Sequence, residues 1–318
     1  MADMLAPAPV ETTDAGGRRG RLRGPGDPRR GGTPGRPRLA RYLGVLPFLA
    51  FVAVFLLWPT YIVVAGAFQD ADGRPTTANV TTVTGNDTFV DAFVRSIELS
   101  VVTALIGAVL GALLAWAVTE GNPDGFLRRT VIAASGVLAQ FGGVMLAFAF
   151  LATFGFNGLV TLFLRDSFGV DTFESGSWIY GFTGLGVVYT YFQIPLMLIV
   201  FLPAIEGLRP QWREASDSLG GSTWAYWRHV GGPILAPSFI GATLLLFANA
   251  FSAYATAAAL ISQGSPLVTL QIRTAVTSEV VLGQANVGKA LALGMVIVVA
   301  VVMTLYALLQ RRTARWLR

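Results

Sequence analysis

One stretch of the chain has the glycine and lysine spacing of a phosphate-binding loop. Gly283 and Gly288 are followed by Lys289, but Ala290 stands where such a loop needs Ser or Thr to hold Mg²⁺. The loop should also follow a strand of a soluble α/β unit, whereas this stretch lies at the start of a long apolar segment. No other nucleotide-binding pattern occurs. We therefore expect no ATP site in this chain.

Thiol and metal chemistry are restricted by composition. The chain has no cysteine, which excludes disulfides, thiol nucleophiles and cysteine metal ligands. Its single histidine, His229, cannot form a histidine cluster. No group of His, Asp or Ser residues has a spacing suited to catalysis. The sequence therefore predicts a protein that is not an enzyme, with no metal site and no cofactor of its own.

A polar and aromatic stretch, residues 214–237, lies between two long apolar segments. Across its start, apolar residues recur at intervals of four, three and four, at Leu208, Trp212, Ala215 and Leu219. This spacing predicts a short amphipathic helix over 209–219 with one apolar stripe. Such a helix is too short to span a bilayer, so its stripe needs another partner.

Two glycines, Gly220 and Gly221, should end this helix. Ser222 or Thr223 can then cap a second short helix over 224–230, which we expect to end at the glycines and proline of 231–233. The aromatic residues of this bent pair suit a belt at the lipid headgroups and anchors in a protein pocket equally well. They are Trp212, Trp224, Tyr226 and Trp227.

This stretch resembles the EAA loop of permease subunits of binding-protein-dependent ABC importers. The pattern of that loop is Glu-Ala-Ala, three residues, Gly, nine residues and Ile-x-Leu-Pro. Its matched positions here are Glu214, Ala215, Ser216, Gly220, Val230 and Pro233, with Gly232 in place of the leucine. The resemblance covers roughly the whole chain after residue 40, and it implies that these six residues couple the chain to a separate ATPase. The segment 251–260 looks more like the polyamine, ferric-iron and phosphonate branch of the family than the sugar branch.

The composition is that of a membrane protein. Hydrophobic residues make up 53% of the chain and charged residues 13%, against about 25% charged residues in soluble domains. Six segments have the length and apolarity of bilayer spans, near 43–68, 96–118, 131–154, 178–202, 237–261 and 288–310. We therefore predict an all-α integral membrane protein with six transmembrane helices over 41–318. The resemblance implies the type I (MetI-like) ABC importer permease fold.

Shorter features are predicted between the spans. Residues 69–95 are polar and are expected to form an exposed loop, whereas the apolar runs 159–164 and 267–276 predict short helices. Within the second span, the spacing of Gly107 and Gly111 predicts a close contact between helices.

The basic residues predict an orientation. Residues 1–40 are rich in Gly, Pro and Arg, and they predict a disordered tail that orients the first span and does not bind nucleic acid. With this tail inside, 18 of the 23 basic residues fall on the inner side of the spans. The positive-inside rule then places both termini and the loop over 206–236 in the cytoplasm, with the chain in a bacterial inner membrane.

Few polar residues lie in the spans. Glu98 is the ionisable residue clearly inside one, and Gln193, Asn249 and Tyr254 are our candidates for a solute pathway. The resemblance implies a permease subunit that imports a polyamine, ferric iron or phosphonate. Its implied partners are two ATP-binding cassette subunits, a second permease in a homo- or heterodimer, an extracytoplasmic solute-binding protein and the lipid bilayer. The alternative is a stand-alone secondary transporter or channel, for which Glu98 alone is little support.

Overall fold

The computed structural model describes residues 45–122, 124–174, 176–261, 267–277 and 285–314. The predicted tail and Gly283 of the glycine–lysine stretch lie outside these residues. The chain divides into two compact units, Met1–Ala53 and Val54–Arg318. In the first unit the described part is helix α2 (Leu46–Val52) and the start of the π-helical turn η1 (Ala53–Leu57).

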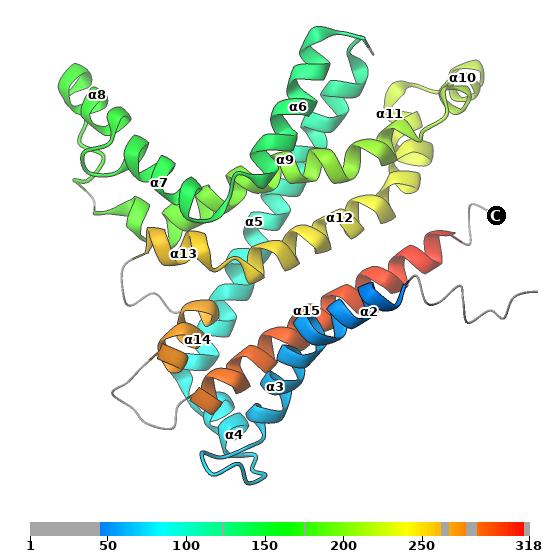
Figure 1. The fold of residues 1–318 in the computed structure, drawn as a ribbon. Helices are drawn as coiled ribbons and strands as arrows, with labels where there is room; N and C mark the ends of the chain where they lie inside the picture. Colours follow the sequence, from blue (N-terminus) through cyan, green and yellow to red (C-terminus); the bar gives the residue numbers. More distant parts are fainter. Residues whose placement is uncertain (1–44, 123, 175, 262–266, 278–284, 315–318) are drawn as a thin grey trace, which may run out of the picture. The chain divides into compact units, whose positions relative to one another are not determined.

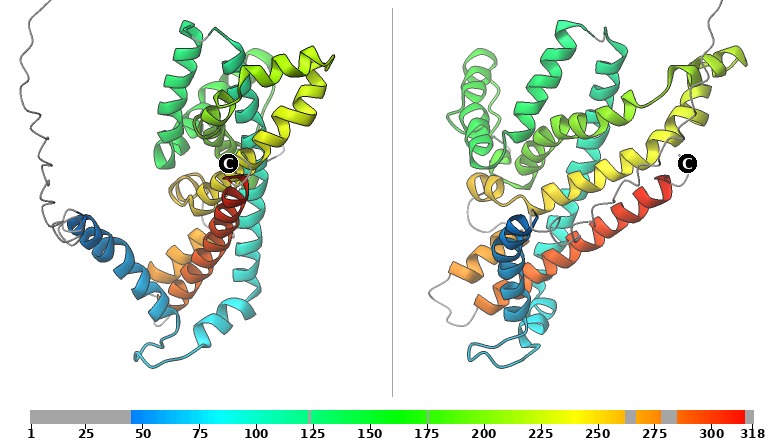
Figure 2. Two further views of the ribbon diagram at one scale, coloured as in Figure 1. Left: turned by 90° about the vertical axis from the view of Figure 1, so that its right-hand side faces the viewer. Right: turned by 45° about the vertical axis from the view of Figure 1, so that its right-hand side comes forward.

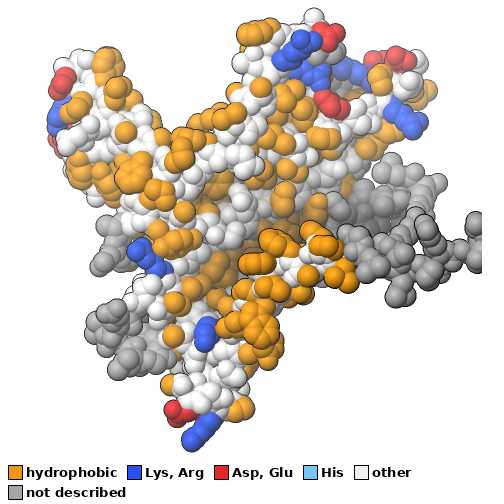
Figure 3. Space-filling model, viewed as in Figure 1, with side chains coloured by type: hydrophobic (Ala, Val, Ile, Leu, Met, Phe, Trp, Pro, Cys, Tyr) orange, Lys and Arg blue, Asp and Glu red, His pale blue; other side chains and the backbone are white. Residues whose placement is uncertain are grey.

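Six helical segments among the described residues are long and apolar enough to cross a membrane. They are Leu46–Ala67, Asp87–Glu120, Gly143–Phe168, Phe182–Glu206, Thr223–Ser252 and Ala285–Leu309. The prediction of an all-α membrane protein with six spans is therefore confirmed. Figure 3 shows hydrophobic side chains over much of the visible face of the molecule, as expected for a surface in contact with lipid.

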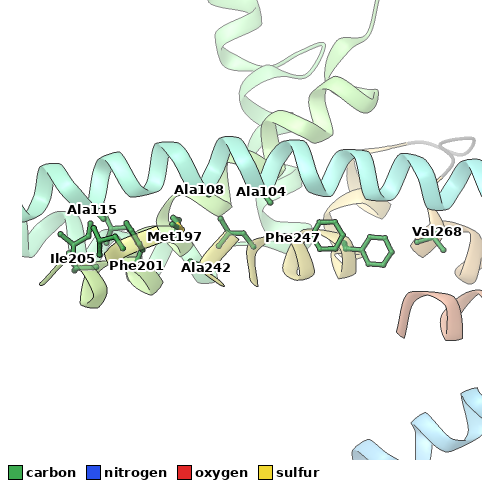
Figure 4. Packing of buried hydrophobic residues seen from close by; sticks show 14 of the residues in the cluster. Ala104, Ala108, Ala115, Met197, Phe201, Ile205, Ala242, Phe247 and Val268 are labelled. Atoms are coloured by element: carbon green, nitrogen blue, oxygen red, sulfur yellow. The ribbon is translucent and has the colours of Figure 1, made fainter. Parts of the chain in front are cut away.

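Three long helices form the centre of the second unit. Helices α5 (Asp87–Glu120), α9 (Phe182–Glu206) and α12 (Gly232–Ser252) pack against one another (Figures 1 and 2). Their contact faces pair small residues of α5 with larger residues of α9 and α12 (Figure 4). The residues on these faces include Ala104, Ala108 and Ala115 of α5, Met197, Phe201 and Ile205 of α9, and Ala242 and Phe247 of α12.

The predicted glycine contact is confirmed, and it lies between α5 and α9. A Cβ atom added to Gly107 would lie 2.6 Å from the Cβ of Gln193. One added to Gly111 would lie 2.5 Å from the Cβ of Met197 and 2.6 Å from the carbonyl oxygen of Ile194. Since real side chains do not approach this closely, only glycine allows the two helices their present separation.

Gln193 joins all three central helices by hydrogen bonds. Its side chain is fully buried. With its amide oriented so that both ends find partners, its oxygen accepts from the Thr103 hydroxyl at 2.8 Å and the Ala104 amide at 3.2 Å. Its nitrogen donates to the carbonyl oxygen of Leu246 at 3.2 Å. One side chain of α9 is therefore bonded to both α5 and α12.

Replacing Gln193 with leucine is expected to lower the melting temperature of the detergent-purified protein. Interhelical hydrogen bonds in membrane proteins contribute about 0.6 kcal/mol each, so three of them contribute about 2 kcal/mol. Gln140→Leu is the matched control, because Gln140 is exposed at the end of a peripheral helix. Equal melting temperatures for the two variants would show that the Gln193 bonds do not stabilise the protein.

Helix α15 (Ala285–Ala314) packs against α12 and against three shorter helices. These three are α3 (Trp58–Ala67), α4 (Ala78–Gly85) and α14 (Val268–Thr277). Two asparagine side chains hold this region together. Asn79 donates to the carbonyl oxygens of Ala67 and Gln69, and Asn286 donates to that of Gln69 at 2.9 Å.

The prediction of an exposed loop over 69–95 is wrong for most of its length. Helix α4 lies within it, and α5 already begins at Asp87. The Asn86 side chain accepts a hydrogen bond from the Thr88 amide at 2.9 Å. This N-cap starts α5 in a polar stretch that hydrophobicity alone assigns to a loop.

The third and fifth predicted spans are also interrupted. Residues 131–154 are divided between α6 (Phe126–Gln140) and α7 (Gly143–Phe154), because Gly143 has a φ of +69°. Residues 237–261 are divided between α12 and α13 (Ala255–Leu260). The third span is instead Gly143–Phe168, made of α7 and α8 (Leu159–Phe168).

Two smaller predictions are confirmed and one is shifted. The short helices predicted at 159–164 and 267–276 correspond to α8 and α14, although α8 is part of the third span and does not lie between spans as predicted. The start of the predicted fourth span is a separate 3₁₀ turn, η2 (Trp178–Tyr180), which precedes α9.

Candidate functional site

The loop over 206–236 begins with the predicted amphipathic helix, α10 (Pro210–Ser218). Gly220 ends it with a φ of +76°, which residues with side chains rarely adopt. The Gly221 amide then donates to the carbonyl oxygen of Ser216 at 2.9 Å. A Cβ atom at Gly221 would lie 2.6 Å from the Ser216 hydroxyl oxygen. The two glycines therefore make the sharp turn that the sequence predicts.

The second part of the loop differs from its prediction. Helix α11 (Thr223–Tyr226) starts as expected, with the Ser222 hydroxyl accepting from the Ala225 amide at 3.3 Å. It does not end at 231–233, however. A π-helical turn, η3 (Trp227–Gly231), leads directly into α12, so that Thr223–Ser252 is one continuous helical segment.

The π-helical turn explains why the glycines and the proline do not break the helix. The Gly232 amide donates to the carbonyl oxygen of Trp227, five residues earlier. Pro233, which has no N–H to donate, follows directly on this π-helical turn at the start of α12. A Cβ atom at Gly232 would lie 2.5 Å from the Trp227 oxygen. Glycine therefore fits this turn, at the position where the EAA pattern has leucine.

The tip of the loop exposes two large apolar side chains. Leu219 is 90% exposed and Trp224 is 74% exposed. Helix α10 has no buried residue at all. The other aromatic residues of the second helix face inward, since Tyr226 is buried and the Trp227 ring meets Trp116 of α5 edge to face at 6.5 Å. The loop is thus anchored at its base and unpartnered at its tip.

Two ion pairs hold the base of the loop and the neighbouring helix ends. Arg213 of α10 lies 3.6 Å from Glu120, the last residue of α5. Arg128 of α6 pairs with Glu206, the last residue of α9. Figure 3 shows charged side chains gathered over the tips of these helices. The sequence predicts neither pair, because no local pattern joins residues so distant in sequence.

The six residues predicted to couple with an ATPase all lie on this loop. Gly220 makes its turn, and Glu214 is exposed without an ion pair among the described residues. The other four differ in exposure: Ala215 and Pro233 are exposed, and Ser216 and Val230 are half-buried. The coupling role of these residues stays a prediction.

The predicted pathway residues do not form one cluster. Gln193 is buried between helices, whereas Asn249 and Tyr254 are exposed at the far end of α12. A cavity of about 630 Å³ is lined instead by α5, α7 and α9. Glu98 is the one carboxylate among the described residues that line it, and none of the three predicted residues does. The pathway role of these three stays a prediction.

Two helix breaks meet, one at the start of the third span and one at the end of the fifth. The break between α6 and α7 and that between α12 and α13 are joined by a hydrogen bond from the Thr256 hydroxyl to the carbonyl oxygen of Gly143, at 3.2 Å. The Tyr189 hydroxyl donates to the freed carbonyl oxygen of Ala253. Irregular backbone within a membrane is tolerated where protein or a water-filled cavity satisfies it, and transporters use it around their pathways.

The chain is similar in sequence to several curated permeases, although no protein-family model matches it. It is 26% identical over 176 residues to a probable permease protein for starch degradation products, AmyD, of Thermoanaerobacterium thermosulfurigenes, covering 49% of this chain and 59% of the relative. It is 29% identical over 93 residues to the putative ferric transport permease FbpB 1 of Haemophilus influenzae, covering 29% of this chain and 14% of that protein. It is 35% identical over 74 residues to a spermidine/putrescine permease PotC homolog of Mycoplasma genitalium, covering 23% and 26%. The chain thus spans less than two thirds of the length of these relatives.

Solved structures match over a larger part of the chain. A bacterial ABC transporter that imports the acidic polysaccharide alginate has a chain with a TM-score of 0.69 at 16% identity, covering 87% of this chain and 96% of the other. The inward-facing MetNI methionine ABC transporter matches with a TM-score of 0.53 at 17% identity, covering 70% and 95%. The resemblance to ABC importer permeases that the loop indicated is thus confirmed, and this chain has the fold of the type I permeases.

Proposed function

We propose that this chain is a permease subunit of an ATP-driven ABC importer, and that it couples to a separate ATPase through Glu214–Pro233. The observation that carries this proposal is the loop over 206–236. Its tip exposes Leu219 and Trp224, two large apolar side chains of the kind that bind in a pocket of a partner protein. Its fold and the names of its sequence relatives support the same function.

The mechanism follows from the continuity of the loop with the central helices. Since α11, η3 and α12 form one helical segment, a displacement of the loop moves α12 as a rigid element. Helix α12 packs on α5 and α9, and it ends at the break where Ala253 meets Tyr189. ATP-driven movement of the loop would thus reach the helix breaks and alternate the access of the pathway between the two membrane sides.

The proposed assembly follows from the same function. Two ATP-binding cassette subunits would bind the loops of two permeases, which are copies or relatives of this chain, and ATP would be bound by those subunits. A solute-binding protein would deliver the cargo, as a periplasmic protein does in the alginate transporter structure. We place the chain in a bacterial inner membrane with both termini in the cytoplasm. This placement rests on the distribution of its arginines.

The proposed cargo is a polyamine, ferric iron or a phosphonate. This choice rests on the segment 251–260 and on the ferric and spermidine/putrescine transport names among the relatives. The starch-product and sulfate transport names of two other relatives do not favour it. Asn249 and Tyr254, which are exposed beside the α12 break, are our candidates for contact with the cargo.

Reconstitution tests the function directly. The chain, reconstituted with its proposed ATPase and solute-binding partners, should take up solute into liposomes only when ATP is supplied. Glu214→Lys should lower this uptake, since it reverses a charge on the proposed docking surface. Uptake driven by a proton or sodium gradient without any ATPase would instead support the stand-alone carrier, for which the Glu98 cavity and the helix breaks would then provide the pathway.

The orientation has its own test. Because the chain has no cysteine, Ser218→Cys introduces a unique thiol beside the tip of the loop. A membrane-impermeant maleimide should label it in inside-out vesicles and not in intact cells. Labelling of intact cells would show that the loop faces outward.

A further inference from the structure

A charged cavity lies beneath the loop. Its volume is about 490 Å³, and the ends of α5 and α9, the start of α6, and the loop itself line it. Its charged lining residues are Glu120, Arg128, Glu206, Arg209 and Arg213. The two ion pairs described above occupy four of them. The fifth, Arg209, makes no ion pair among the described residues, and its guanidinium lies 5.9 Å from the centre of the Trp212 ring.

An apolar cavity of about 310 Å³ adjoins the charged one. Both cavities are lined by Trp116, Ile205 and Trp227, so they adjoin each other, and we treat them together as one groove. The apolar end follows α5, α9 and α12 into the hydrophobic part of the spans, where Leu113 and Leu235 line it. The groove therefore has a cationic end at the helix termini and an apolar end among the helices.

We propose that this groove binds an acidic phospholipid, with the phosphate near Arg209 and Arg213 and one acyl chain in the apolar end. The net charge of the cationic end is one positive charge, which suits a phosphodiester. The groove begins at the ends of two candidate spans, Glu120 and Glu206, and the ends of membrane-spanning helices are where lipid headgroups meet a protein. Tryptophan rings such as those of Trp116 and Trp227 are favoured at this depth.

A free phosphate would use only half of the groove. The apolar end has hardly any polar surface and offers nothing to a soluble anion. A membrane lipid fills both ends, because its headgroup and acyl chain are joined in one molecule. Since Arg213 belongs to α10 and Trp227 to η3, the bound lipid would contact the base of the loop.

Binding to the purified full-length chain tests the proposal. Native mass spectrometry in a neutral detergent should show phosphatidylglycerol binding at least tenfold more tightly than phosphatidylcholine. The double variant Arg209→Gln/Arg213→Gln should remove this preference, and Arg209→Lys/Arg213→Lys should keep most of it. The matched control is Arg129→Gln/Arg228→Gln, which removes two charges from the same end outside the groove and should change affinity less than twofold.

A second variant separates lipid from soluble anion. Leu113→Trp should fill the apolar end and weaken phosphatidylglycerol binding about tenfold, with the arginines intact. Glycerol 3-phosphate should compete poorly with the lipid. Three results would overturn the proposal: equal binding of both lipids, an equal loss in the control double variant, or competition by glycerol 3-phosphate at the concentration of the lipid, which would assign the site to a soluble anion.

Discussion

Replacing both Leu219 and Trp224 with aspartate is expected to reduce ATP-driven uptake to background and to stop the ATPase from co-purifying with this chain. These side chains are the most exposed apolar groups of the loop, at 90% and 74%. Residues that anchor an interface contribute about 2 kcal/mol or more when truncated, and each 1.4 kcal/mol is a tenfold change in affinity. Two anchors lost together therefore weaken binding roughly a hundredfold or more.

The fold should survive this change, since neither side chain packs on the rest of the protein. Expression and melting temperature should therefore match the unaltered chain. Leu127→Asp is a suitable control, because Leu127 is 75% exposed at the nearby start of α6 but lies off the loop. If Leu127→Asp abolished uptake as fully as the loop variant, or if the loop variant kept its ATPase, the loop tip would not be the docking surface.

Gly111→Val is expected to have the largest effect on the fold. The first added carbon would lie 2.5 Å from Met197 and 2.6 Å from a backbone oxygen of α9. A backbone oxygen cannot move away by a change of rotamer, as a side chain can, so α5 and α9 must separate. Overpacking of this kind typically costs about 1–3 kcal/mol, and here it also disturbs the adjacent Gln193 bonds. The protein should aggregate at a lower temperature, or fail to elute as a single species from a size-exclusion column.

Gly136→Val distinguishes packing from a general effect of losing a glycine. Gly136 lies in α6, and a Cβ atom added there would have no atom within 4 Å. This variant should elute and melt like the unaltered protein. If both variants lowered the melting temperature equally, the loss of stability would not come from the close approach of α5 and α9 at Gly111.

The sequence predicts the parts of this fold that depend on local composition. Length and apolarity identify six spans, with the third displaced from 131–154 to 143–168, and the spacing of Gly107 and Gly111 identifies a close contact between helices. The turn at Gly220 and the cap at Ser222 also follow from the preferences of single residues. These features need no knowledge of what lies elsewhere in the chain.

The features that the sequence does not reveal depend on distant partners. The break before Gly143 coincides with Gln140 and the glycine pair at 142–143, a local signal that the overall apolarity of 131–154 hid, and its bond to Thr256 joins residues more than 100 positions apart. The pairing of Arg213 with Glu120 has no local signal. At 231–233 the prediction fails differently, because two glycines and a proline are usual helix breakers and a π-helical turn accommodates them here.

Helix α5 is longer than a membrane is thick. Its 34 residues, at 1.5 Å each, extend roughly 51 Å, whereas the hydrocarbon layer of a bilayer is about 30 Å deep. Part of this single hydrogen-bonded rod therefore stands in water or is taken up by tilt. Glu120, at one end of α5, pairs with Arg213 of the loop, and α4 packs near the other end. A displacement of the loop can therefore be transmitted through this one helix to the opposite face of the bilayer.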